Sequence, residues 1–346
     1  MQKSNSKFAV LPVMFGFFIM GFVDIVGVAT SYVKADFAGM DDKVSGLISL
    51  SCFLWFLILS IPTGMLMNRI GRKKTVVVSF AITALAMLIP LGQFIKAMSS
   101  FLGPILAAMF AGSVWGWKAI FPVYAAVTVL AMAWLAVSPI QEQLIEKSEI
   151  TFARTFSLLR DKYIVLFFIG ILVLVGVDVG MGVTFPKLLQ ERCSLPLEKA
   201  GMGNSVYFLA RTVGAFLGGV VLMRFSASKF FTASSCLALV SLVGLIFSRN
   251  LTMILFFVAL FGLGYANLFS IIFSLSMQKM PQKTNEVSAL LIVGVSGGAV
   301  LPPLLGVITD TFGTQGSALI TLAIVWVYMV ALIPFVRNVR PSGNEN

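Results

Sequence analysis

Residues 64–74 read GMLMNRIGRKK and separate two long apolar runs. Four of these eleven residues are positive and two are glycine. An apolar span that ends in such a cluster is typical of a membrane helix leaving the bilayer on the cytoplasmic side. This basic segment therefore predicts a membrane protein whose second span runs toward the cytoplasm.

The composition supports a chain whose solvent is lipid. Of 346 residues, 58% are hydrophobic and only 11% are charged, whereas soluble domains carry about 25% charged residues. The net charge of +11 fits lysine and arginine accumulating in cytoplasmic loops. We find no basic and aromatic cluster of the nucleic-acid kind and expect no nucleic-acid partner.

Several classes of site are excluded by residue content. The chain has no histidine, and its three cysteines lie far apart, so we expect neither a disulfide framework nor a metal site. No nucleophile and base lie in a catalytic pattern. We therefore expect no enzyme activity, no metal and no cofactor.

Runs of about 20 apolar residues predict the membrane spans. The first half offers spans at about 8–32, 44–67 and 119–137, with one long run over 75–112 between them. A mixed-charge segment over 141–162 predicts a linker with a short amphipathic helix at the membrane surface. The second half offers six spans, at about 163–184, 201–223, 230–247, 252–277, 287–308 and 317–336. This division predicts an N-terminal bundle (1–139), a linker (140–162) and a C-terminal six-helix bundle (163–346).

The spacing within the basic segment carries a family resemblance. G-x-L-x-N-R-x-G-R-K resembles the loop between helices two and three of major facilitator superfamily transporters, where an aspartate takes the place of Asn68. A worn copy, GVVLMRFS at 219–226, is what two related halves would leave. The resemblance implies an all-α integral membrane fold of two helical bundles and a gating motif made of Gly64, Asn68, Arg69, Gly71, Arg72 and Lys73. Because asparagine lacks the charge of the usual acid, we expect a weaker contact to the neighbouring helix end, by about 0.3–1 kcal/mol.

Within that superfamily the chain resembles the fucose permease and glucose/galactose symporter branch. The resemblance rests on Asp24, on GQFIKA (92–97) with FLGP (101–104), and on GGAVLPPLLG (297–306). In that branch the Gly-Gln-Phe stretch opens the fifth helix, whereas here it directly follows the third. The resemblance implies that the fourth helix is absent and that the first bundle is shortened.

The long run leaves two topologies open. As one helix, 75–112 would measure roughly 57 Å, against about 30 Å for one crossing. A tight turn at 90–93 gives two crossings, eleven spans and an inverted second half. A single kinked crossing gives ten spans and keeps the orientation, which the distribution of lysine and arginine favours.

Charged residues inside spans predict functional positions. Asp24 matches, by resemblance, a first-helix acid that takes part in proton coupling, and a structural acid is the alternative. Asp178 and Arg211 lie at similar depths in adjacent spans, which predicts a buried ion pair, and we also assign Asp178 to proton coupling. Lys96 either pairs with an acid or extends to the surface.

Sugar recognition needs neutral hydrogen-bonding groups and an aromatic face. Five residues fit that chemistry, with helix packing as the alternative role of the last two: Gln93, Asn204, Tyr207, Tyr265 and Asn267.

The function that these features predict is proton-coupled uptake of a monosaccharide by alternating access. We expect a monomeric, multi-pass protein of the bacterial inner membrane, with a sugar, a coupling ion (H+ rather than Na+) and the bilayer as partners. A truncated, transport-inactive member that acts only as a structural or interaction protein is the alternative. Drug efflux is the third possibility, and which sugar is carried stays open.

Overall fold

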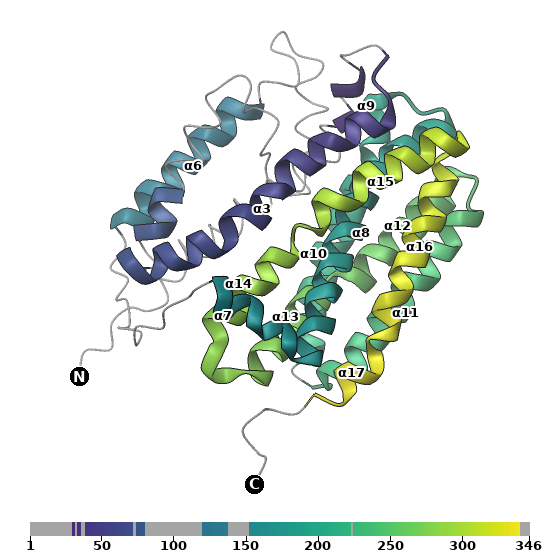
Figure 1. Ribbon diagram of the computed structural model, residues 1–346. Helices are drawn as coiled ribbons and strands as arrows, with labels where there is room; N and C mark the ends of the chain where they lie inside the picture. Colours follow the sequence, from purple (N-terminus) through teal and green to yellow (C-terminus); the bar gives the residue numbers. More distant parts are fainter. Residues whose placement is uncertain are drawn as a thin grey trace.

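The computed structural model describes residues 30–31, 33–35, 39–71, 74–79, 120–137, 152–222 and 224–339. Every element in these ranges is helical, which confirms the all-α expectation (Figure 1). The first half contributes α3 (Asp42–Ile70) and α6 (Ile120–Val137), and the linker contributes α7 (Phe152–Ser157) and η4 (Leu158–Arg160). The second half contains α8 (Lys162–Cys193), α9 (Leu197–Ala200), α10 (Met202–Leu222), α11 (Ala227–Phe247), α12 (Leu251–Tyr265), α13 (Leu268–Lys279), η5 (Pro281–Lys283), α14 (Thr284–Gly294), α15 (Gly297–Phe312), α16 (Gln315–Ala331) and α17 (Ile333–Arg337).

Seven helical segments among the described residues are long and apolar enough to cross a membrane. One is Asp42–Met67, and the other six lie between 162 and 337, where the sequence predicts six spans. Residues 80–119, which hold most of the ambiguous run, and the first 29 residues lie outside the described ranges. The count of spans in the first half therefore stays a prediction.

Helix α8 lies at the centre of the second bundle (Figure 1). Asp161 begins it, with a carboxylate that accepts hydrogen bonds from the backbone N–H groups of Tyr163 and Ile164 at 2.8 and 3.1 Å, as an N-cap residue should. The helix continues to Cys193 and ends at Ser194, whose φ is 51°. It is nine residues longer than the span expected to end at Thr184, so it carries Lys187 into the helical bundle.

Two membrane segments of the second half are interrupted. Leu251–Lys279 consists of α12 and α13, which are separated at 266–267, and α14 and α15 are separated at 295–296. Discontinuous helices at such depth free backbone groups and are typical of binding sites in secondary transporters.

The two halves meet where α3 packs along α14 and α15. Gly46 faces Pro303, and a Cβ on Gly46 would lie 2.8 Å from the Pro303 Cα. Farther along α3, Phe53 covers Gly298, and the Ser60 hydroxyl donates to the Ala289 carbonyl at 2.8 Å. Residue numbers rise along α3 as they fall along α15, so these helices are antiparallel.

Helix α8 runs parallel to α15, since Gly176 faces Gly297 and Gly180 faces Leu305. The C-terminal end of α3 therefore lies at the same end of the molecule as the N-terminal end of α8. We call this the inner end, and the opposite end, where α3 begins at Asp42, the outer end. This relative orientation is the one that the lysine and arginine distribution favours.

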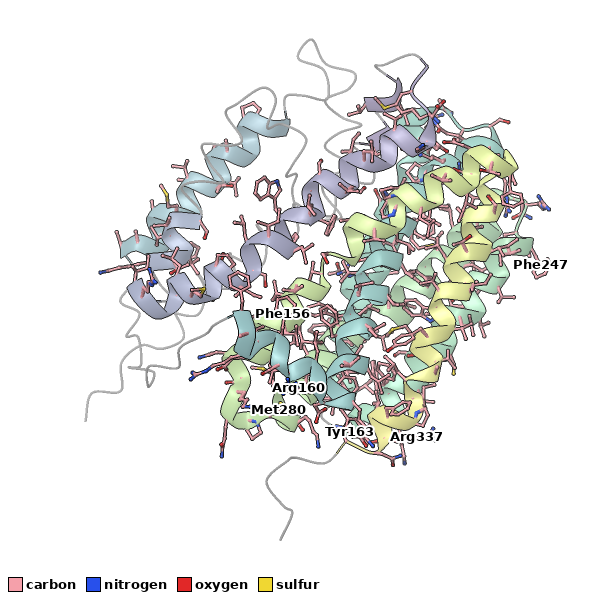
Figure 2. All side chains as sticks on the ribbon, viewed as in Figure 1. Phe156, Arg160, Tyr163, Phe247, Met280 and Arg337 are labelled. Atoms are coloured by element: carbon pink, nitrogen blue, oxygen red, sulfur yellow. The ribbon has the colours of Figure 1, made fainter. Side chains whose placement is uncertain are left out.

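Basic and aromatic side chains gather at the inner end. The ammonium groups of Lys162 and Lys279 lie 5.4 and 5.2 Å from the centre of the Tyr163 ring. Arg160, Tyr163 and Arg337 lie near α7 and α17 in Figure 2. Such a cluster is typical of the cytoplasmic ends of membrane helices.

Candidate functional site

An acid and a base from neighbouring helices pair inside the second bundle. Arg211 Nη1 of α10 lies 2.9 Å from Asp178 Oδ2 and 3.2 Å from Asp178 Oδ1 of α8. The Asp178 side chain is 9% exposed and that of Arg211 is 28% exposed. Because an isolated charge is expensive at this depth, each residue compensates the other.

Two tyrosines complete this cluster, which we call the inner pair site (Asp178, Tyr207, Arg211 and Tyr265). The buried Tyr207 hydroxyl donates to Asp178 Oδ1. The Arg211 guanidinium lies over the Tyr265 ring, 4.8 Å from its centre, a favourable cation–π arrangement. Tyr265 is the last residue of α12, so the site borders the interruption between α12 and α13.

Asn204 and Asn267 bind neighbouring helices instead of joining the inner pair site. The Asn204 amide donates to the Gly182 carbonyl of α8 at 2.9 Å, and the Asn267 amide donates to the Gly214 carbonyl of α10 at 2.8 Å. Asn204 Oδ1 is buried and has no hydrogen-bond partner in the described part of the chain. Both residues hold helices together in this structure.

The glycines before Tyr265 let three helices approach closely. A Cβ on Gly262 would lie 2.6 Å from the Tyr207 carbonyl oxygen of α10. A Cβ on Gly264 would lie 2.9 Å from the backbone of Ala238 and Ser234 of α11. Small residues at these positions place Tyr265 against α10 and beside Arg211.

Part of the predicted machinery lies outside the described residues. This holds for Asp24, Gln93, Lys96, Arg72 and Lys73, and for the side chain of Asn68. The other members of the gating motif lie at the inner end of α3: Gly64 is buried, Arg69 is exposed, and Gly71 ends the helix with a φ of 88°. A positive φ favours glycine, because it has no Cβ to clash.

A second charged cluster, which the sequence analysis missed, lies at the outer end. Asp42 Oδ1 accepts from Lys34 Nζ at 2.6 Å and from Lys187 Nζ at 2.7 Å. Asp42 Oδ2 accepts from Thr309 Oγ1 at 3.2 Å and from Gln315 Nε2 at 3.0 Å. We call these five residues the outer network.

The sequence carried a signal for this cluster. Asp42 lies two residues before the expected span at 44–67, and Lys187 lies three residues after the expected span at 163–184. Both residues lie outside the expected spans, where charges are common and do not by themselves indicate a functional position. With the orientation kept, the start of the second span and the end of the first span of the second half lie at the same membrane face, which brings these opposite charges together.

Neither cluster is built to hold a metal ion. No group of three or more cysteine, aspartate or glutamate side chains lies together among the described residues. Each carboxylate is already bound by ammonium, guanidinium, hydroxyl or amide donors. The chemistry available is hydrogen bonding, ion pairing and proton exchange.

Comparison with known proteins agrees with this architecture. The sequence profile of the Major Facilitator Superfamily matches residues 182–346. A variant of the Escherichia coli fucose:proton symporter FucP has a similar fold, with a TM-score of 0.70, 15% identity, and coverage of 97% of this chain and 99% of that chain. The sequence of the second half of the chain therefore resembles this superfamily, and the fold of the whole chain resembles that of FucP. A FucP structure in the outward conformation is also similar, with a TM-score of 0.55 at 15% identity over 97% of this chain and 91% of that chain.

Proteins named as glucose/galactose transporters are among the relatives that this chain matches. A Brucella abortus protein named glucose/galactose transporter is 21% identical over 374 positions, covering 90% of each chain. A Helicobacter pylori protein, whose name proposes a glucose/galactose transporter, is 28% identical over 166 residues. That match spans 47% of this chain and only 40% of the relative. The superfamily is one of transporters, which agrees with the expectation that the chain is not an enzyme.

Proposed function

We propose that this protein is a secondary active transporter that takes up a monosaccharide together with a proton by alternating access. The observation that carries the proposal is the inner pair site, a buried acid with a guanidinium and two tyrosines beside an interrupted helix. The relatives named as glucose/galactose transporters support a monosaccharide as the substrate. In secondary transporters, interrupted helices of this kind typically form the substrate site at the interface between the two bundles.

In this proposal, Asp178 binds a proton and, as a result, releases Arg211. A protonated Asp178 has no charge for Arg211 to bind, so the guanidinium becomes free to donate to sugar hydroxyls. When Asp178 loses the proton, it pairs with Arg211 again, and the guanidinium no longer donates to the sugar. Tyr265 offers an aromatic face to the ring, and Tyr207 holds the carboxylate in place.

The first half supplies the remaining roles by resemblance. We assign a second proton-coupling role to Asp24 and sugar contact to Gln93. In the second half, we assign sugar contact to Asn204 and Asn267 from their hydrogen-bonding chemistry. Asn204 Oδ1, which lacks a hydrogen-bond partner in the described structure, leaves one acceptor for a ligand that rearranges this region. We place the protein in a bacterial inner membrane as a monomer, with H+ as the coupling ion.

A transport-inactive family member is the second candidate. The Brucella abortus alignment is 374 positions long, which exceeds the 346 residues of this whole chain. The relative therefore carries residues without a counterpart in this chain. If the first bundle cannot close a sugar site, the protein acts as a membrane-embedded structural or interaction partner.

Uptake by purified protein in proteoliposomes tests these candidates. We expect one labelled hexose of a panel including fucose, glucose and galactose to accumulate when the exterior is acidic relative to the lumen. Asp178→Asn should abolish accumulation driven by the proton gradient. Tyr328→Phe, which removes a hydroxyl bonded to the Leu166 carbonyl at 3.0 Å outside the site, is the matched control and should transport normally. Folded protein that moves no hexose in either direction would favour the inactive candidate.

A further inference from the structure

The outer network joins the two halves of the molecule. Asp42 and Lys34 belong to the first half, whereas Lys187, Thr309 and Gln315 belong to the second half. The Asp42 side chain is 7% exposed and that of Lys187 is 9% exposed. The ion pair between them is therefore buried between the bundles.

A second carboxylate crosses the same interface. Asp310, at the end of α15, accepts from the backbone N–H groups of Asp42 and Lys43 at 3.2 and 2.8 Å. These groups lie at the N-terminus of α3, where unpaired N–H groups and the helix dipole favour an anion. The carboxylate of one half thus binds the helix end of the other.

The backbones approach closely at this level. A Cβ on Gly306 of α15 would lie 2.5 Å from the Asp42 carbonyl oxygen. The Lys187 ammonium also donates to the Ser45 hydroxyl at 3.3 Å. Together, these contacts bring the first turn of α3 against the ends of α8 and α15, so a route from the outer face between these helices is closed.

Lys34 differs from the other partners of Asp42 because its bond stays within one half. Its side chain is 39% exposed and lies 2.6 Å from the carboxylate. When the halves separate, Asp42 loses Lys187, Thr309 and Gln315 but can keep Lys34. Lys187, in contrast, loses its carboxylate and enters water.

We propose that Asp42 and Lys187 form an outer gate of this protein, and that Lys34 keeps Asp42 neutralised when the gate opens. The gate holds the outer end closed through the ion pair and through Asp310 on the N-terminus of α3. In the closed state the Asp42 carboxylate binds both Lys34 and Lys187, and in the open state it binds Lys34. This inference rests on the proposed alternating access for its purpose, but the contacts it invokes hold the halves together whether or not a sugar is carried.

Accessibility of one buried position measures this gate without any substrate. Ser49 is fully buried and lies on the α3 face that packs on the second half, seven residues or about 10 Å below Asp42. We would place a single cysteine there (Ser49→Cys) after replacing Cys52, Cys193 and Cys236 by serine. Its labelling by a membrane-impermeant maleimide, added at the outer face of right-side-out vesicles, reports opening.

Lys187→Met should raise the labelling rate about tenfold or more, because it removes the ion pair between the halves while Lys34 still neutralises Asp42 in the open state. Lys34→Met should lower the rate or leave it unchanged, since it removes the partner that serves the open gate. Asp310→Asn should raise the rate by a smaller factor. The role proposed for Lys34 is wrong if Lys34→Met raises the labelling rate as Lys187→Met does.

The gate itself is refuted if labelling stays at the parent rate in Lys187→Met and in Asp310→Asn while both proteins remain monodisperse in detergent. If Lys187→Met does not fold, Asp310→Asn and Gln315→Leu carry the same test. Hexose uptake is measured separately. If the variants change the labelling rate but the protein takes up no hexose, the gate is supported and the transport function is rejected. If uptake is normal and the labelling rate does not change, the transport function is supported and the gate is rejected.

Discussion

Two buried acid–base pairs of similar geometry lie in different mechanical settings. Asp178 and Arg211 are 2.9 Å apart within one bundle, and Asp42 and Lys187 are 2.7 Å apart between two bundles. Helices α8 and α10 belong to the same bundle, so we expect the first pair to survive a movement of the halves and to break on a change of charge. The second pair is broken by movement. This difference predicts that one pair responds to protons or ligand and the other responds to conformation.

The largest effect should follow from removing the base of the inner pair site. Arg211→Met leaves the Asp178 carboxylate in the bundle with only the Tyr207 hydroxyl, and we expect a loss of about 3–5 kcal/mol of stability. Thermal unfolding in detergent measures it. Adding Asp178→Asn to Arg211→Met should restore much of the unfolding temperature. A double variant as unstable as the single would show that the ion pair is not what the arginine supplies.

Removing the acid of the outer network should cost less stability but change the conformation. Asp42→Asn leaves Lys187 with the Ser45 hydroxyl, and the lysine can reach water when the halves separate. We expect a loss of about 1–3 kcal/mol, together with faster labelling of Ser49→Cys. Asp178→Asn, as the matched change in the other pair, should leave that labelling unchanged. Equal labelling in both variants would remove the distinction between the two pairs.

An added methyl group tests the approach of the halves without changing charge. Gly306→Ala places a Cβ 2.5 Å from the Asp42 carbonyl oxygen, and the overlap should cost about 1–3 kcal/mol and loosen the outer end. Gly219→Ala is the matched control, because nothing lies within 4 Å of its added Cβ. This exposed helical site should gain up to about 1 kcal/mol. Chemical denaturation and the labelling rate of Ser49→Cys, measured in both variants, distinguish these outcomes.

The smallest effect should follow from removing one hydroxyl of the inner pair site. Tyr207→Phe takes away a donor to Asp178 while Arg211 remains, so we expect a loss of about 1 kcal/mol. Proton-driven uptake should weaken without a change in outer labelling. Tyr328→Phe removes a comparable hydroxyl elsewhere, and a similar loss of uptake in both variants would assign the effect to packing alone.

The inner pair site was accessible to sequence reasoning because depth can be counted along a helix. Asp178 and Arg211 stand out as charges within apolar spans, and their distances from the span ends match. The basic segment at 64–74 predicts the direction of α3 by the same kind of reasoning. The direction of α3 follows from a single span, and the Asp178–Arg211 pair follows from two adjacent spans whose directions are known.

The outer network could not be derived in that way, because its partners are separated by long stretches of sequence. Lys187 looked like a loop residue until α8 proved to continue to Cys193. Asn204 and Asn267 show the opposite difficulty. Their polarity suggested a sugar site, but a buried amide is equally suited to bind the carbonyl of an adjacent helix, and the sequence alone does not distinguish the two.

The cap that Asp310 provides has a consequence for the length of α3. The carboxylate of Asp41, which precedes the helix, makes no capping hydrogen bond, so the first N–H groups of α3 depend on a residue 268 positions away. When the halves part, these amides lose their acceptor and must turn to water. The first turn of α3 should then fray, and amide hydrogen exchange at Asp42 and Lys43 should be fast in the open state and slow in the closed one. The helix would thus be longer in one state of the cycle than in the other, and the halves would not move as rigid bodies.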